Sequence, residues 1–305
     1  MSNYNDIIDF VKNQFQSTDF IPLHEPNFSG NERKYVMDTI DSTFVSSVGA
    51  YVDKFELMLS QLTKTHKAVA VVNGTSGLQV ALRLSGVGMG DEVLTQALTF
   101  IATINAIIYN SASPVFIDVD IDTMGLSPNA VEIFLEQFGE LRNGVCFNKK
   151  TNKKIAACMP MHTFGFPVHL DELITVCNKW NIPVVEDAAE SIGSEYKGKP
   201  TGSFGKLGVF SFNGNKIVTS GGGGAIVTNE IELGIKAKHL TTTAKVPHPY
   251  EYVHDEVGYN FRMPNLNAAL ACAQMEQLDS FIQNKRALAL EYNKFFKTKG
   301  INFRT

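Results

Sequence analysis

Cysteine is scarce in this chain, with four residues among 305. None of the four belongs to a CxxC pair, and no histidine stands at ligand spacing from any of them; they are Cys146, Cys158, Cys177 and Cys272. We therefore expect neither a disulfide framework nor a zinc site. No pair of histidines has metal-ligand spacing either, so the sequence predicts no metal. A reducing cytoplasm is the natural setting for such a chain.

Long apolar runs and an excess of one charge are also missing. No apolar run approaches the ~20 residues of a membrane-spanning helix, and the N-terminus lacks the basic and apolar regions of a signal peptide. The 27 basic and 31 acidic residues nearly balance, so no polycationic surface for nucleic acid is expected. A correctly placed dinucleotide fingerprint is absent too. Gly86–Gly90 carries the glycines, but it follows a predicted helix and precedes a predicted strand, the reverse of the Rossmann order.

What is present is an alternation of short apolar runs and helical patterns, typical of an α/β protein with a largely parallel sheet. Strands are predicted at 68–72, 92–94, 114–118, 155–160, 182–186, 208–212 and 224–228. Helical patterns cover 78–84, 101–108 and a stretch from Pro264 to about Phe296. The character of the chain changes near 241. We expect an N-terminal arm and a large domain over 1–240, and the start of a smaller domain over 241–305.

Lys216 lies in a run of small and polar residues after a short apolar strand, with Ser211 five residues before it. Asp187 ends another apolar strand. An amine that can form an imine, a carboxylate for a ring nitrogen and a hydroxyl for a phosphate are the groups that hold pyridoxal phosphate (PLP). A buried carboxylate without a partner is costly, and a pyridinium N–H would satisfy it. The alternative is a solvated lysine and an aspartate that caps a helix at Ala188.

The segment Asn73–Gly77 directly follows a predicted strand and opens a helix. Backbone N–H groups at a helix N-terminus, together with the hydroxyls of Thr75 and Ser76, suit a phosphate. The alternative is ordinary N-capping by Thr75 or Ser76. In open α/β sheets the ligand binds outside the carboxyl ends of the strands, where this segment and Asp187 both fall.

Many segments in the same order resemble the DegT/StrS family of sugar aminotransferases. They are Asn73–Leu78, Gly90–Val93, Thr99–Thr103, Glu186–Glu190, Gly202–Gly205, Phe210–Lys216, Gly221–Gly224 and Gly258–Pro264. The resemblance covers nearly the whole chain and implies the aspartate-aminotransferase fold, a fold-type I PLP-dependent transferase with a mixed, mainly parallel sheet. The domain over 1–240 would bind PLP. Family members continue beyond the position of Thr305, so the small domain is expected to be incomplete.

The resemblance also implies roles for particular residues. Lys216 would be the Schiff-base lysine, and Asp187 would pair with the pyridine nitrogen. The other cofactor contacts would come from Thr75, Ser76 and Ser211 on the phosphate, Phe100 stacked on the ring, Glu190 where the family often has His or Gln near the ring hydroxyl, and Asn260 reaching the neighbouring subunit's cofactor. Arg262 would meet an anionic group of the substrate. These last two roles imply a homodimer with shared active sites.

Two details resemble enzymes of legionaminic acid and related 4-amino-sugar pathways. The segment 143–154 is predicted as a hairpin inserted before the strand at 155. The run Gly221–Gly224 is all glycine, where family members commonly include a glutamate. Glycine can be chosen where backbone must pass close to a ligand.

The resemblance implies transfer of an amino group from an amino acid, L-glutamate by preference, to the keto carbon of a nucleotide-linked 4-keto-6-deoxyhexose, C4 rather than C3. The product would serve amino-sugar and surface polysaccharide biosynthesis. One alternative is a sugar dehydratase of the same fold, but such relatives have His in place of Lys216. Another is a non-catalytic regulatory or partner-binding protein with this fold. Visible absorbance and a borohydride-trappable cofactor would distinguish the enzyme from both.

Three further features have structural interpretations. His162 follows a predicted strand and is interpreted as a satisfied structural histidine rather than a pocket residue. Arg83 is interpreted as part of a solvated helix face. The apolar stripe Leu266, Ala269, Leu270 and Ala273 has helical spacing, which indicates core or a dimer interface.

Overall fold

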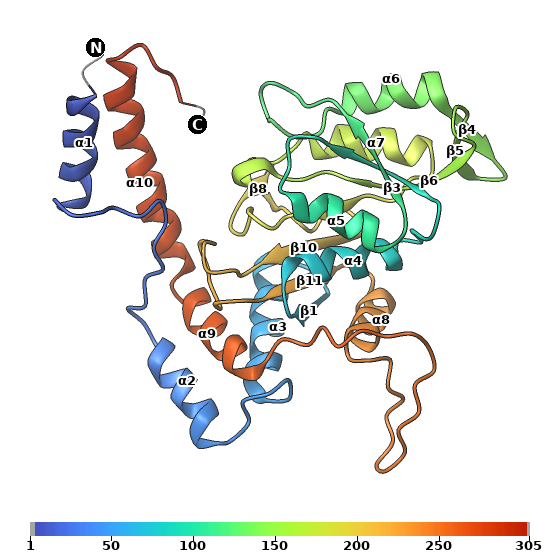
Figure 1. Cartoon of the computed structure of the whole chain (residues 1–305), viewed down its shortest axis with the longest axis horizontal. Helices are drawn as coiled ribbons and strands as arrows, with labels where there is room; N and C mark the ends of the chain where they lie inside the picture. The colour runs from blue at the N-terminus through green and yellow to red at the C-terminus, as the bar shows by residue number, and fades with distance from the viewer. Residues whose placement is uncertain (1–3, 304–305) are drawn as a thin grey trace.

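The computed structural model describes residues 4–303 (Figure 1). Its strands are β1 (Lys67–Val71), β2 (Glu92–Gln96), β3 (Ser113–Ile117), β4 (Gly139–Arg142), β5 (Val145–Asn148), β6 (Lys153–Met159), β7 (Val185–Asp187), β8 (Glu195–Tyr196), β9 (Lys199–Pro200), β10 (Leu207–Ser211) and β11 (Gly224–Thr228). Each strand expected from the sequence is present, with bounds that differ from the expected ones by at most three residues. The helices are α1 (Asn5–Phe15), α2 (Glu32–Asp41), α3 (Ala50–Thr63), α4 (Gly74–Leu84), α5 (Ile101–Tyr109), α6 (Pro128–Phe138), α7 (Leu170–Lys179), α8 (Ile231–Thr241), α9 (Asn265–Met275) and α10 (Leu278–Lys297), with a 3-10 turn at Thr163–Gly165.

The central sheet is mixed and mainly parallel, as predicted. One part has the order β1-β11-β10-β7, and the other has the order β3-β2-β6-β5-β4. Parallel bridges from Cys158 to Val184 and from Met161 to Asp187 join β6 to β7, so the two parts continue into each other. β11 runs antiparallel to both of its neighbours, whereas β7 and β10, β2 and β3, and β2 and β6 pair in parallel.

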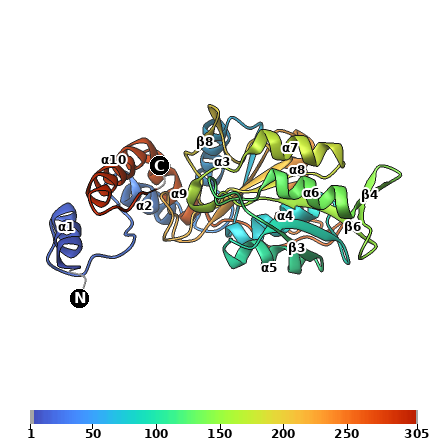
Figure 2. The same ribbon diagram turned by 90° about the horizontal axis from the view of Figure 1, so that it is seen from above.

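Helices cover both faces of this sheet because its strands are apolar on both sides. In β1, Val69 and Val71 pack with α4 and α8 on one face, and Ala68 and Ala70 pack with α3 and α9 on the other. Around β2, β3 and β6, the apolar side chains of α6 and α7 form a third cluster. Figure 2 shows the sheet between these helices. No helix among residues 4–303 has the length and apolar character needed to cross a bilayer.

The terminal helices pack together at one end of the molecule (Figure 1). The ring of Phe10 in α1 stacks on Phe295 in α10, with centroids 4.0 Å apart. The single helical stretch predicted from Pro264 to Phe296 is wrong, since α9 and α10 are separate and break at Glu276–Gln277. Side-chain bonds to the N-terminal part of the chain accompany the break: Gln277 donates to Glu32 at 2.6 Å. No glycine or proline marks this position, so the local pattern does not reveal it.

The predicted insertion before β6 is a hairpin of β4 and β5. Its two turn residues, Asn143 and Gly144, both have positive φ, 51° and 80°. This is the Asn-Gly turn chemistry that matches the right-handed twist of a two-stranded ribbon. The hairpin begins at Gly139, four residues before the predicted start. The expected domain boundary near 240 falls at the end of α8 and stays a prediction.

Candidate active site

The N-terminus of α4 and the end of β10 are in direct contact. Asn73 caps the helix, since its Oδ1 accepts a hydrogen bond from Ser76 N at 2.8 Å. The interpretation in which Thr75 or Ser76 caps the helix is therefore wrong, and their hydroxyls are not used as caps. A Cβ on Gly74 would lie 3.0 Å from the Cβ of Ser211. Ser211 thus lies beside the first turn of α4, which carries Thr75 and Ser76 and whose first amides have no intrahelical partner; we call this group of residues the cradle.

Gly224, the first residue of β11, packs against the backbone at the start of α4. A Cβ on Gly224 would lie 2.5 Å from the carbonyl carbon of Asn73 and 2.6 Å from Gly74 N. Any side chain here would displace the backbone at the start of α4. Glycine is required at position 224 because two backbone segments are in contact there. This packing explains the glycine directly, without the approach of a ligand.

Asp187 ends β7 with its side chain in the interior, 2% exposed. Its Oδ2 accepts from the hydroxyl of Thr103 at 2.7 Å, and its Oδ1 accepts from Ala189 N at 3.2 Å. Burial raises the pKa of Asp187, and these two hydrogen bonds oppose the shift. Turns rather than a helix follow at Ala188, so the helix-capping interpretation is wrong. The carboxylate keeps lone pairs for a further donor.

Lys216 follows β10 and points at Glu190. Its Nζ lies 2.9 Å from Glu190 Oε1, and the two side chains are 16% and 31% exposed. The interpretation of Lys216 as a solvated surface lysine is therefore wrong. The pair borders a cavity of about 220 Å³, whose other lining residues are Phe164, Ala189, Ile192, Asn215 and Ile217. A mostly buried amine beside a cavity is accessible to a small carbonyl compound.

The other predicted residues, Phe100, Asn260 and Arg262, are not among those that line this cavity. Phe100, directly before α5, has 70% of its surface exposed. Arg262 Nε donates to Asn260 Oδ1 at 3.0 Å, so the amide and the guanidinium act on each other within one chain. Their segment runs along the end of β1, where Val72 N donates to the Phe261 carbonyl at 2.8 Å. This edge adjoins the start of α4, but the structure shows neither side chain inside the cradle.

These groups fit the predicted cofactor. A ring nitrogen finds an acceptor in Asp187, whose burial favours a charged partner. A phosphate finds the amides and hydroxyls at the start of α4 and at Ser211. An aldehyde finds the amine of Lys216. The cradle is tight enough that a Cβ on Gly74 would contact Ser211.

Comparison with known proteins shows to which family the chain belongs. Residues 26–304 match the model of the DegT/DnrJ/EryC1/StrS aminotransferase family. The chain belongs to this family. It is 39% identical over 275 residues to the GDP-perosamine synthase of Escherichia coli O157:H7, covering 90% of this chain and 71% of that protein.

Two solved structures support the fold, and the second of them also supports the cofactor. The aminotransferase from Psychrobacter cryohalolentis is 31% identical, with a TM-score of 0.74 over 85% of this chain and 64% of that one. A protein of Streptococcus pneumoniae, described as a sugar aminotransferase in its pyridoxamine phosphate form, is 25% identical, with a TM-score of 0.80 over 91% of this chain and 72% of that one. The chain thus spans about two thirds of the length of these relatives.

The comparisons confirm the fold class and PLP as the cofactor predicted from the sequence. They also confirm the predicted class, a PLP-dependent nucleotide-sugar aminotransferase, at the level of the family. The role of each site residue remains a prediction, as does the resemblance to the legionaminic acid subgroup.

Some residues near the family's site escaped the sequence reasoning. Thr103 is the direct partner of Asp187, and its only sequence signal is its place in the Thr99–Thr103 segment of the resemblance. His24 from the N-terminal arm lies beside the backbone carbonyl of Lys216, and burial lowers the pKa of its imidazole. No local pattern connects residues this far apart in the chain.

The interpretation of Arg83 as a solvated residue is wrong. Its guanidinium donates to the hydroxyl of Tyr259 at 2.9 Å and lies 5.3 Å from the centre of that ring. Tyr259 in turn stacks on Phe261, with ring centroids 4.8 Å apart. Arg83 therefore anchors the segment that carries Asn260 to α4.

Proposed function

We propose that this chain transfers the amino group of L-glutamate to C4 of a nucleotide-linked 4-keto-6-deoxyhexose, for amino-sugar and surface polysaccharide biosynthesis. The observation that carries the proposal is the Lys216–Glu190 pair at the cavity, together with the buried carboxylate of Asp187. Similarity to a GDP-perosamine synthase supports a nucleotide-sugar acceptor. A cytoplasmic location stays part of the proposal.

Each site residue would contribute one action. PLP, when bound, carries the amino group between the two substrates and withdraws electrons from the reacting carbon. Asp187 would keep the proton on the ring nitrogen, and the start of α4 would anchor the phosphate. Lys216, once released, would move a proton as general base and general acid. Glu190 accepts a hydrogen bond from the same amine, so it would hold the end of the Lys216 side chain in place at that stage.

A panel of nucleotide keto-sugars tests the proposal. We expect amine formation from L-glutamate and at least one GDP-, UDP- or dTDP-linked 4-keto-6-deoxyhexose, with one equivalent of 2-oxoglutarate released. Mass spectrometry of the sugar and a coupled assay of the keto acid measure this. The 3-keto isomers serve as controls and are expected to react far more slowly. PLP-loaded protein that aminates none of the 4-keto sugars would contradict the proposed substrate class.

We also propose that the enzyme is a homodimer with two shared active sites. Ile101, Ile108 and Tyr109 of α5 and the neighbouring Phe100 each expose more than half of their surface. A second copy is the proposed cover for this apolar face, since each subunit of a two-fold dimer offers the same surface. Helix α9 packs against α2 and α3 of its own chain; of the stripe on this helix, Ala269 and Ala273 are buried, whereas Leu266 and Leu270 are half-buried.

Subunit exchange between inactive variants tests the shared site. Asn260→Ala and Lys216→Ala would damage opposite contributions to each site. Because random exchange makes half of the dimers heterodimers with one intact site, mixing should restore up to about a quarter of wild-type activity. Light scattering and mass-tagged subunits monitor assembly and exchange. Proven exchange without recovered activity, or a fully active monomer, would refute the shared-site proposal.

A further inference from the structure

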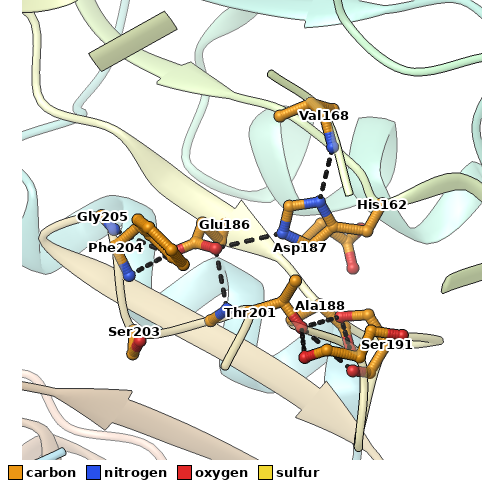
Figure 3. Close-up of polar contacts among 12 residues, drawn as sticks. His162, Val168, Glu186, Asp187, Ala188, Ser191, Thr201, Ser203, Phe204 and Gly205 are labelled. Atoms are coloured by element: carbon orange, nitrogen blue, oxygen red, sulfur yellow. Dashed lines mark hydrogen bonds and ion pairs between the residues drawn. The ribbon is translucent and has the colours of Figure 1, made fainter. Parts of the chain in front are cut away.

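Glu186 is a fully buried carboxylate with four hydrogen-bond donors (Figure 3). Its Oε1 accepts from Phe204 N at 2.7 Å and Gly205 N at 2.6 Å. Its Oε2 accepts from Gly202 N at 2.7 Å and from Nε2 of His162 at 3.0 Å. Burial acts to raise the pKa of Glu186, but the hydrogen bonds outweigh it and lower the pKa. Glu186 is therefore an ionised and fully satisfied group.

His162 connects Glu186 to the backbone of Asp187. Its ring lies in the interior, and Nδ1 accepts from Val168 N at 3.4 Å, a pattern that assigns the proton to Nε2, facing Glu186. The backbone N of His162 donates to the Asp187 carbonyl at 3.1 Å. One residue thus holds the side chain of Glu186 and the main chain of Asp187, and the interpretation of His162 as a satisfied structural histidine is confirmed.

Glu186 also connects Asp187 to the strand that carries Ser211 and leads to Lys216. Its donor Gly202 has a φ of +80° and packs so tightly on β10 that a Cβ on Gly208 would lie 2.1 Å from the Gly202 carbonyl oxygen. Next to it, Thr201 donates to the carbonyl of Ser191 at 3.0 Å, which fixes the turn that carries Glu190. The segment after β6, the end of β7 and the start of β10 therefore meet at one carboxylate.

We propose that Glu186 and His162 are a positioning pair that fixes the end of β7, so that the carboxylate of Asp187 keeps its bonds to Thr103 and Ala189 and faces the cofactor ring. Successive side chains of a strand point to opposite faces, so the two adjacent acids occupy opposite sides of β7. Glu186 needs no ligand of its own, whereas Asp187 does. The inference deepens the proposed function and rests on it for the role of Asp187.

The titration of Asp187 distinguishes positioning from a simple effect of charge. The other titratable groups around it are His162, Lys216, Glu186 and Glu190, the last paired with Lys216. Glu186→Gln removes a negative charge next to Asp187, and by charge alone the pKa of Asp187 would fall. If the end of β7 instead loosens and the bonds from Thr103 and Ala189 lengthen, the pKa of Asp187 rises. The charge effect and the loosening of β7 therefore change the pKa of Asp187 in opposite directions.

The experiment measures the carboxyl carbon of Asp187 by NMR in the cofactor-free protein, assigned by its loss in Asp187→Asn. We expect the pKa of Asp187 to be higher in Glu186→Gln than in wild type, and kcat of the PLP-loaded enzyme to fall about tenfold with KM nearly unchanged. Glu92→Gln is the matched control, because Glu92 is also buried but begins β2 at the opposite edge of the sheet. A fall or no change in the pKa of Asp187 overturns the proposal, whatever happens to kcat.

A second pair of variants covers the case in which Glu186→Gln does not fold. His162→Gln retains a donor for Glu186 and should stay close to wild type, whereas His162→Leu should raise the pKa of Asp187 and lower kcat. Equal behaviour of the two variants overturns the proposal. The failure of the proposed function is recognised separately: wild-type protein without a borohydride-trappable PLP on Lys216 would disprove it, while the titration in the cofactor-free chain would still decide the positioning pair.

Discussion

Lys216→Ala is expected to abolish amino transfer while the protein stays folded and still binds PLP through its phosphate. Lys216 is the amine at the cavity, and the start of α4 holds its hydroxyls and amides without any contribution from it. Loss of a group that bonds covalently to the reacting molecule removes at least about a thousandfold in rate. The measurements are kcat with the preferred keto-sugar, the visible absorbance of bound cofactor and the mass of the borohydride-reduced chain.

Lys199→Ala is the matched control for this variant. Lys199 lies on β9, exposed, with its amine 4.3 Å from the centre of the Phe204 ring and away from the cavity. It should retain wild-type activity and a PLP adduct on Lys216. If Lys216→Ala turned over substrate at the wild-type rate, or if reduction labelled another lysine in wild type, the assignment of Lys216 would be wrong.

Asp187→Asn is expected to lower the rate about a hundredfold, because a neutral amide does not hold the ring nitrogen in its protonated form. The same variant should fold normally. Steady-state kinetics and the absorbance of the bound cofactor measure the first effect, with Glu92→Gln as a second buried acid whose change should leave activity intact. Near-normal activity of Asp187→Asn would exclude the role on the ring nitrogen.

The free energy of unfolding of the cofactor-free protein tests the environment of Asp187 independently of activity. The folded chain raises the pKa of Asp187, chiefly through burial, so folding favours the protonated carboxyl. The associated stability is fully present below the unfolded pKa of about 3.9 and is lost as pH rises through the raised folded pKa. At pH 7 the ionised carboxylate of Asp187 therefore lowers the free energy of unfolding. Urea unfolding should find cofactor-free Asp187→Asn at least as stable as wild type at pH 7, with this advantage declining towards pH 4. A clear loss of stability at pH 7 would instead indicate a structural role.

Much of the site could be predicted from the sequence because its main groups are tied to local patterns. The apolar runs that become β1, β7 and β10 set where each strand ends, and in a parallel sheet these ends share one edge. Asn73, Asp187 and Ser211 follow directly from that rule, and Lys216 comes shortly after the third strand. The order of the segments gave the family, which the comparisons confirm.

Only the tertiary structure decided which side chains meet. Lys216 and Glu190 are 26 residues apart, Thr103 and Asp187 are 84 apart, and His162 and Glu186 are 24 apart. Arg83, which was interpreted as solvated, and Tyr259 are 176 residues apart. Periodicity reports which face of an element is apolar, but hydrogen-bond geometry depends on how distant strands and turns are brought together. The break between α9 and α10 has the same origin, since bonds from Gln277 to Glu32 accompany it and neither glycine nor proline stands there.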